Sequence, residues 1–173
     1  MKFLDESGVT TQMTRLWGRA PRGERVHEAT PEGRWQVLTT LGTLSVRGMQ
    51  AVMTVASATD GDVFHAFVEL VVCATLQPGD VLVMDNLSAH KVAGIRELIA
   101  ARGAQLLYLP PYSPDFNPIE LCFAKLQAIL RTARGRTLEA LWQTIGLCLP
   151  RFDAAECRAY FRHCGYSVAA VRS

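Results

Sequence analysis

The sequence lacks any uninterrupted apolar run of about 18 residues, and no charged-then-apolar leader segment opens it. We therefore expect neither membrane insertion nor secretion. Cysteine pairs with Cys-x-x-Cys spacing are also missing, and the five cysteines are an odd number. These absences argue against a zinc site or a disulfide framework, and they favour reduced thiols in a cytoplasmic protein.

The chain also lacks a strong excess of charge of either sign, with 18 Lys and Arg residues against 16 Asp and Glu residues. This balance permits binding to nucleic acid but does not indicate it, because dedicated nucleic-acid-binding domains are usually more basic. Internal repeats, low-complexity tracts and linkers are absent as well. With 173 residues, 49% of them hydrophobic and 20% charged, we expect one globular domain with a sizeable core.

Apolar periodicity divides the chain into strands and helices. Strands are expected at residues 2–5, 35–41, 44–56, 81–84 and 104–109. The second and third of these are expected to form a hairpin with a short break at Gly42. Helices are expected at residues 63–76, 92–101, 118–132, 138–149 and 154–162. The hairpin favours antiparallel pairing, whereas the later alternation of strand and helix favours parallel pairing. We therefore predict an α/β fold with a mixed five-stranded sheet, helices on both faces and a helical C-terminal tail.

Three acidic residues stand at the ends of expected buried elements. Asp5 follows an apolar pair, Asp85 ends the apolar run 81–84, and Glu120 closes the Pro-rich segment 109–120. Thirty-four residues separate Asp85 from Glu120. Carboxylates are the hard oxygen ligands that Mg²⁺ and Mn²⁺ prefer, so this placement indicates a metal site rather than a solvated surface.

The segments that carry these acids resemble a known family. Phe-Leu-Asp-Glu-Ser-Gly at 3–8, Asp-Asn at 85–86 with His90, and Tyr-Ser-Pro-Asp-Phe-Asn-Pro-Ile-Glu at 112–120 are similar to the catalytic domain of mariner-like DDE transposases from bacterial insertion sequences. The 34-residue spacing is that family's own. The resemblance implies a ribonuclease-H-like, retroviral-integrase-like fold in which the first and fourth strands lie side by side. It also implies DNA cut-and-join chemistry, as in DNA transposition, recombination and integration.

The resemblance further implies that Asp5, Asp85 and Glu120 are catalytic and bind two Mg²⁺ or Mn²⁺ ions. Two such ions about 3.5–4 Å apart activate a water or a 3′-hydroxyl and stabilise the departing oxygen during phosphodiester cleavage. In this interpretation Asp85 bridges the two ions, and Glu120 completes the coordination of the second ion.

Each acid also has a structural interpretation. Asp5 could start a turn, and Asp85 could cap one. Asn117, Pro118 and Glu120 would occupy the N-cap, N1 and N3 positions of a helix, which is a capping-box pattern. A metal ligand must aim away from its own backbone, so Glu120 cannot fill both roles at once.

Six further residues would support the carboxylates or contact DNA: Asn86, His90, Lys91, Tyr112, Asn117 and Lys125. Tyr112 would stack on a flipped or frayed base, or would pack against its own loop. His90 and Lys91 would orient a carboxylate or bind a phosphate, or would belong to a loop and the start of a solvated helix. The early loop carries four arginines, at positions 15, 19, 22 and 25, which favour a β-hairpin that would face DNA.

One departure from the family concerns the N-terminus. Complete members carry a helix-turn-helix region that recognises the ends of the element, and with the first acid at position 5 we expect this region to be absent. We expect a single catalytic domain over residues 1–173, with a core to about residue 133 and a helical tail from about 134. The expected partners are transposon-end and target DNA, a separate helix-turn-helix subunit and a second copy of the chain. The expected location is the bacterial cytoplasm, on the nucleoid when bound to DNA.

Two other functions are compatible with the sequence. A truncated, catalytically inactive transposase remnant would keep the fold and would only bind DNA or a partner. A phosphohydrolase of the haloacid-dehalogenase type also places a nucleophilic Asp after its first strand. Against this second function, Ser7 stands where its second Asp is required, and a late pair of Asp residues is missing.

Overall fold

The computed structural model describes residues 1–86 and 92–168. Its centre is a five-stranded sheet in the order β3-β2-β1-β4-β5. The strands are β1 (Lys2–Thr10), β2 (Val37–Ser45), β3 (Gly48–Val55), β4 (Val81–Met84) and β5 (Gln105–Tyr108). The β1–β2 and β2–β3 pairs are antiparallel, whereas β1–β4 and β4–β5 are parallel. The predicted mixed sheet is therefore confirmed, with the first and fourth strands adjacent.

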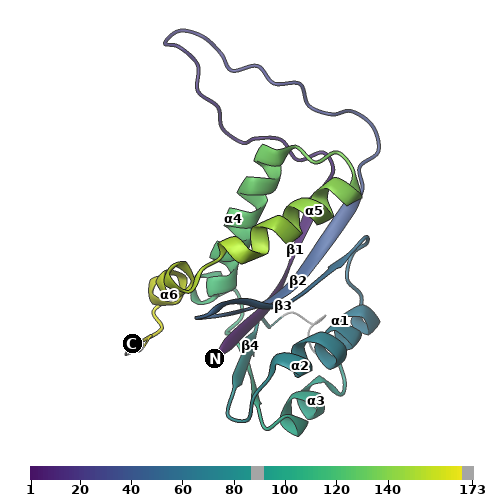
Figure 1. Ribbon diagram of the computed structural model, residues 1–173, viewed down its shortest axis with the longest axis vertical. Coiled ribbons are helices and arrows are strands. Elements are labelled where there is room, and N and C mark those ends of the chain that lie inside the picture. The colour runs from purple at the N-terminus through teal and green to yellow at the C-terminus, as the bar shows by residue number, and fades with distance from the viewer. Residues whose placement is uncertain (87–91, 169–173) are drawn as a thin grey trace.

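Helices cover both faces of the sheet (Figure 1). One face carries α1 (Gly61–Phe67), η1 (Val68–Val72), α2 (Cys73–Thr75) and α3 (Ile95–Ala101). The other carries α4 (Pro118–Ala133), α5 (Leu138–Cys148), η4 (Leu149–Arg151) and α6 (Ala154–His163), and the short turn η3 (Pro114–Phe116) precedes α4. None of the helices in the described part of the chain combines the length and apolarity that a membrane crossing requires.

Each face of the sheet has its own apolar core. Leu4 and Leu82 are fully buried among the side chains of α1, η1 and α3. Phe3 and Val83, their neighbours in sequence, belong to the core formed with α4, α5 and α6. Successive residues of a strand point to opposite faces. A central strand segment that is covered on both sides is therefore apolar at successive positions, which explains the unbroken apolar run of β4 and the apolar pair Phe3 and Leu4 in β1.

Strand boundaries differ from the prediction in β1 and in the hairpin formed by β2 and β3. β1 does not end at Asp5 with a turn but continues to Thr10, because its second half pairs antiparallel with β2. β2 runs through Gly42 to Ser45 instead of breaking at the glycine, so the next strand begins at Gly48 and not at residue 44. The register of β2 with β3 shifts next to Gly42. A Cβ atom at Gly42 would lie 2.5 Å from the terminal methyl of Met49. The glycine therefore gives room for a side chain of the neighbouring strand.

The helices follow the prediction more closely, with two differences. The helix expected at 63–76 forms over 61–75 but contains the π-helical segment η1. A π-turn has wider i→i+5 hydrogen bonding, which the apolar periodicity of the sequence does not reveal. The helix expected at 92–101 begins only at Ile95. The three C-terminal helices agree with the prediction to within one residue at each end.

A long irregular arm, residues 11–36, takes the place of the β-hairpin expected around the four arginines; it connects β1 to β2 and projects from the body of the domain (Figure 1). Hydrogen bonds fix its base. Arg136 Nη1 donates to the carbonyl oxygen of Met13 at 2.9 Å, and Gln12 Nε2 donates to that of Gly33 at 2.8 Å. Arg134 also pairs with Glu28. The C-terminal half of the domain therefore anchors the arm.

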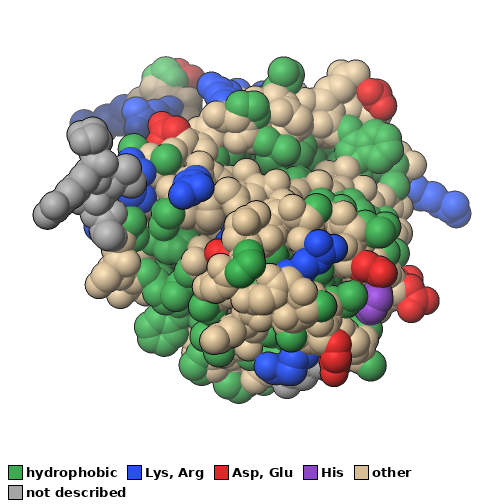
Figure 2. Space-filling view, turned by 60° about the horizontal axis from the view of Figure 1, so that its bottom comes forward, with side chains coloured by type: hydrophobic (Ala, Val, Ile, Leu, Met, Phe, Trp, Pro, Cys, Tyr) green, Lys and Arg blue, Asp and Glu red, His purple; other side chains and the backbone are tan. Residues whose placement is uncertain are grey.

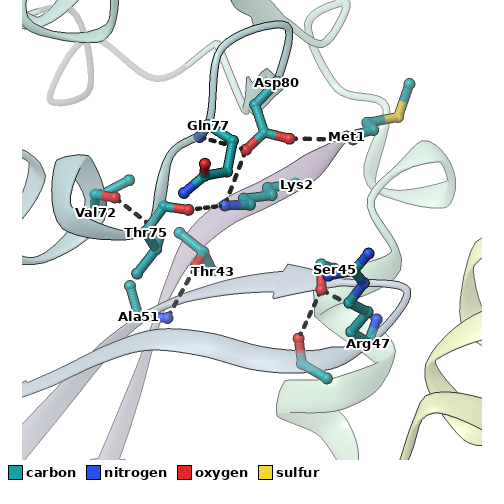
Figure 3. A network of polar contacts seen from close by, with 11 residues as sticks. Met1, Lys2, Thr43, Ser45, Arg47, Ala51, Val72, Thr75, Gln77 and Asp80 are labelled. Carbon is teal, nitrogen blue, oxygen red and sulfur yellow. Dashed lines mark hydrogen bonds and ion pairs between the residues drawn. The ribbon is translucent and has the colours of Figure 1, made fainter. Parts of the chain in front are cut away.

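A polar network closes the end of the sheet where β4 begins (Figure 3). Lys2 is 6% exposed, and its Nζ contacts Asp80 Oδ2 at 3.0 Å and donates to the carbonyl oxygen of Thr75. The Gln77 backbone N–H donates to the same Asp80 oxygen at 2.9 Å. Burial by itself raises the pKa of Asp80, but the donors from Gln77 and Lys2 outweigh it and lower the pKa of this carboxyl.

Candidate functional site

Asp5 and Asp85 occupy adjacent register positions in the middle of the sheet. β1 and β4 pair in parallel, and the last paired residues are Leu4 and Met84. Asp5 and Asp85 are the next residues along these two chain segments. The topology therefore brings together two acids that are far apart in the sequence, at the point where β4 ends.

A pocket of about 340 Å³ opens at the carboxyl ends of β4 and β5. Its wall includes Asp85, Asn86, Asn117 and Glu120 together with the segment 109–114. Asp85 is half-buried, whereas Glu120 is exposed in the first turn of α4. Open α/β sheets bind their ligands at this edge, outside the carboxyl ends of the strands. Two of the three predicted catalytic acids therefore share one pocket at the edge where a ligand is expected.

Asp5 does not line this pocket but is hydrogen-bonded to Asn117, which does. The Asp5 side chain is 5% exposed, and its Oδ2 accepts a hydrogen bond from Asn117 Nδ2 at 2.8 Å. Its Oδ1 accepts from the Glu6 backbone N–H, also at 2.8 Å. N–H donors of this kind stabilise the charged form of a carboxylate that is removed from water. Asn117 is itself 3% exposed and lines the pocket, so it connects the third acid to the other two.

The expected capping box at the start of α4 is wrong in its side-chain part. Asn117 is the N-cap residue and Pro118 follows it, but the Asn117 side chain makes no hydrogen bond to its own helix. Only the backbone carbonyl of Asn117 accepts from the Glu120 N–H, at 3.1 Å. The Asn117 N–H donates to the carbonyl oxygen of Pro114 at 2.8 Å and is therefore unavailable to the Glu120 side chain. A long-range contact with Asp5 has replaced the local one.

The oxygen atoms around the pocket are of the kind that Mg²⁺ and Mn²⁺ prefer. They include the carboxylates of Asp85 and Glu120 and the amide oxygen of Asn117. This amide oxygen is buried, and no donor reaches it within the described residues. Over residues 1–86 and 92–168, however, no three His, Cys, Asp or Glu side chains are grouped closely enough to hold a metal ion. The donor chemistry fits a divalent cation, while the acids are gathered in one region without forming a closed cluster.

The remaining predicted residues have different positions. Asn86 lines the pocket, whereas His90 and Lys91 lie outside the described residues. Tyr112 lies at the pocket with its side chain fully exposed, so it does not pack against its own loop. Its φ of 55° falls in the left-handed region, which costs energy for a residue with a bulky side chain. The loop therefore presents an aromatic ring to solvent beside the acids.

Lys125 contacts α6 and does not line the pocket. Its Nζ donates to both carboxylate oxygens of Glu156, at 2.7 and 2.6 Å, and lies 5.0 Å from the centre of the Phe152 ring. Tyr160 Oη also donates to Glu156, at 2.7 Å. Burial alone raises the pKa of Glu156, but the donors from Lys125 and Tyr160 outweigh it and lower the pKa. This geometry joins α4 to α6.

Sequence reasoning missed Tyr166, which supports the site from the C-terminal side. Its hydroxyl donates to the carbonyl oxygen of Phe116 at 2.7 Å, directly before Asn117. Its ring centre lies 5.0 Å from that of Phe3, on the strand that carries Asp5. A single Tyr just after a helix has no sequence pattern that would have indicated this contact.

Comparison with known proteins agrees with this fold. The sequence model of a family described as DDE superfamily endonuclease matches residues 1–142. No curated protein matches the chain significantly. Among solved structures, the mariner Mos1 paired end complex with Mg is 14% identical, with a TM-score of 0.74, and the match covers 94% of this chain and 52% of that one. The pre-cleavage Mos1 transpososome is also 14% identical, with a TM-score of 0.72 and 94% and 51% covered.

The isolated catalytic domain of the Mos1 mariner transposase is similar as well. It is 15% identical, with a TM-score of 0.59, and the match covers 94% of this chain and 74% of that domain. The chain thus spans about half the length of the Mos1 chains in the larger complexes. These likenesses confirm the predicted ribonuclease-H-like transposase catalytic fold, with its sheet order 3-2-1-4-5.

Proposed function

Because this chain belongs to the DDE superfamily endonuclease family, we propose that it is the metal-dependent DNA endonuclease and strand-transfer domain of an insertion-sequence transposase. The observation that carries the proposal is the pocket at the end of β4, which collects Asp85, Glu120 and Asn117 and connects through Asn117 to Asp5. Support also comes from Mos1, whose solved structures include complexes with Mg and with Mn and a strand transfer complex.

In this proposal Asp5, Asp85 and Glu120 hold two Mg²⁺ or Mn²⁺ ions. Bound ions of this kind supply an activated water or 3′-hydroxyl and stabilise the departing oxygen of the phosphodiester. The protein supplies fixed negative charge at the end of β4. Asp5 is buried and held by two N–H donors, whereas the exposed Glu120 can adjust from the first turn of α4. This division gives one rigid and one adaptable carboxylate.

The proposed substrate is DNA, as transposon ends and as target. Tyr112, fully exposed beside the acids, offers a ring on which a base can stack. The arm adds the exposed arginines at positions 15, 19, 22 and 25 and the 88%-exposed Trp17. On the face drawn in Figure 2, by contrast, basic and acidic side chains are interspersed. We further propose two protein partners, a separate helix-turn-helix subunit and a second copy of this chain.

One observation favours a second candidate function. The described acids do not form a group of three that could hold a metal. An inactive remnant of a transposase, which binds DNA or a partner without cutting, would show this arrangement. The two candidates differ in whether a divalent cation completes the site.

Nicking of supercoiled plasmid DNA with Mg²⁺ or Mn²⁺ separates them. The wild type is expected to nick, and Asp85→Asn or Glu120→Gln is expected to lower the rate at least about 100-fold, because an amide keeps the shape but not the charge that holds the ion. Glu139→Gln is the matched control, since Glu139 is also a first-turn acid, in α5, outside the pocket. DNA binding without nicking by the wild type would favour the remnant, and undiminished nicking by Asp85→Asn would refute the site.

A further inference from the structure

Asn117 stands at an N-cap and does not cap its helix. Asn is among the best N-cap residues and stabilises a helix relative to Ala at this position. The N-cap residues of α5 and α6 do cap: Thr137 Oγ1 accepts from the Ala140 N–H at 3.1 Å, and Asp153 Oδ1 accepts from the Glu156 N–H at 2.8 Å. α4 is the longest helix in the described part of the chain and lacks such a side-chain bond. Another interaction must therefore determine where the Asn117 side chain points.

That interaction is the hydrogen bond to Asp5. A carboxylate has no proton to donate, so the amide NH₂ of Asn117 must face it. The amide oxygen is consequently turned away and is left buried without a donor from the described residues, an arrangement that is destabilising because the oxygen has lost its hydrogen bonds to water. Both side chains are more than nine-tenths buried, and a charge-assisted bond is stronger in a site that excludes water. Asn117 thus gives up the local capping bond of its amide oxygen to make one bond to an acid of the candidate site.

Asn117 is also hydrogen-bonded to Glu120 through its backbone. Its Nδ2 donates to Asp5 Oδ2 at 2.8 Å, while its backbone carbonyl accepts from the Glu120 N–H at 3.1 Å. One residue therefore joins an acid on β1 to an acid on α4.

We propose that Asn117 is a positioning residue that fixes Asp5 relative to Glu120. The inference rests on the proposed function of the pocket and adds to it a residue that sets the separation of two acids. Mg²⁺ requires near-ideal geometry of its oxygen ligands. A misplacement of about 1 Å can lower a rate about 100-fold. The hydrogen bond between Asn117 and Asp5 limits the movement of β1 relative to α4. We therefore expect it to contribute to metal binding and catalysis as well as to stability.

Asn117→Ser tests the proposal. Serine caps a helix as well as asparagine does, but its side chain is shorter and lacks the amide that reaches Asp5. We expect the melting temperature to stay within about 2 °C of the wild type, and both Mn²⁺ affinity by calorimetry and kcat for nicking to fall about 10–100-fold. KM for DNA should not change, because Asn117 is buried. Thr137→Ser, an exchange of one cap for another in α5, should change none of these values. Wild-type Mn²⁺ affinity and kcat in Asn117→Ser would overturn the proposal.

A spectroscopic measurement separates this inference from the proposed function. In ¹⁵N-labelled protein, one side-chain N–H proton of Asn117 should exchange slowly, and its signal should move in Asp5→Ala. The side-chain signal of Gln143, which donates to Glu139 on α5, is the control and should stay in place. A signal that is insensitive to Asp5 overturns the inference, whatever the activity. If the signal moves but the wild type neither binds Mn²⁺ nor nicks, the proposed function fails and the link between Asn117 and Asp5 stands.

Discussion

Mn²⁺ is expected to raise the melting temperature of this chain, because the pocket gathers carboxylates and amide oxygen that only the folded state brings together. A ligand that binds only the folded state stabilises it by RT ln(1 + [L]/Kd), about 2.7 kcal/mol at a hundredfold excess over Kd. Unfolding entropy is about 2.1 cal/mol/K per residue near 60 °C. For 173 residues this amounts to about 0.36 kcal/mol/K. The expected rise is therefore about 7 °C.

Glu120→Gln separates the two roles of Glu120. An acid in the first turn of a helix stabilises it by about 0.3–1 kcal/mol, so the variant should melt about 1–3 °C lower without metal. Loss of a metal ligand has a larger effect on the response to Mn²⁺. If Kd rises a hundredfold at the same Mn²⁺ concentration, stabilisation falls to about 0.4 kcal/mol, or about 1 °C. The change in Mn²⁺ response therefore exceeds the change in helix stability.

Thermal unfolding followed by circular dichroism, with and without MnCl₂, measures both quantities. Glu139→Gln is the matched control, because Glu139 occupies the first turn of α5 and should lose only the helix contribution. A wild-type melting temperature that does not respond to Mn²⁺ would refute the metal site. An Mn²⁺ response in Glu120→Gln equal to that of the wild type would instead identify Glu120 as a helix-end acid only.

Two further predictions concern the contacts that support the site. Asp80→Asn is expected to destabilise the fold at pH 7 by about 1.5–3 kcal/mol, because it leaves the buried Lys2 ammonium without an anionic partner. The pKa of Asp80 is lowered in the folded protein, so the wild-type advantage is present above the ordinary Asp pKa and disappears as the pH falls through the lowered value. Melts of both proteins from neutral to acid pH check this, and equal stability at pH 7 would contradict it. Tyr166→Phe removes the donor to the Phe116 carbonyl and should cost about 1 kcal/mol in urea unfolding, whereas an unchanged midpoint would exclude a stabilising role for this hydrogen bond.

The sheet was predictable because its central strands are covered on both faces. The apolar run of β4 and the apolar pair Phe3 and Leu4 of β1 therefore stand out in the sequence. The second half of β1 was not predictable in the same way. Locally, Asp5 could start a turn, and only the antiparallel partners on β2 hold the residues that follow it in a strand. Local propensity decided the prediction, whereas pairing with a distant segment decides the structure.

In the candidate site, too, some features follow from local sequence patterns and others from contacts between distant segments. The ends of apolar runs located Asp85 and the helix start located Glu120, and the structure places both at one pocket. The pattern at Asn117 predicted a cap, since N-cap, N1 and N3 residues are all of the favoured types. The contact that prevails joins residues 112 positions apart. Such a contact depends on the whole fold and has no signature in the segment itself.

The C-terminal tail contacts the segments that carry the candidate site. The family match ends at residue 142, whereas α6 and Tyr166 lie beyond it. The Tyr166 ring packs against Phe3, which lies on β1 two residues before Asp5 and on the same face. The Tyr166 hydroxyl bonds the carbonyl of Phe116, the last residue before the N-cap of α4. One side chain therefore holds both the strand that carries Asp5 and the turn that presents Asn117. The precision of the site thus depends partly on residues outside the segment that defines the family.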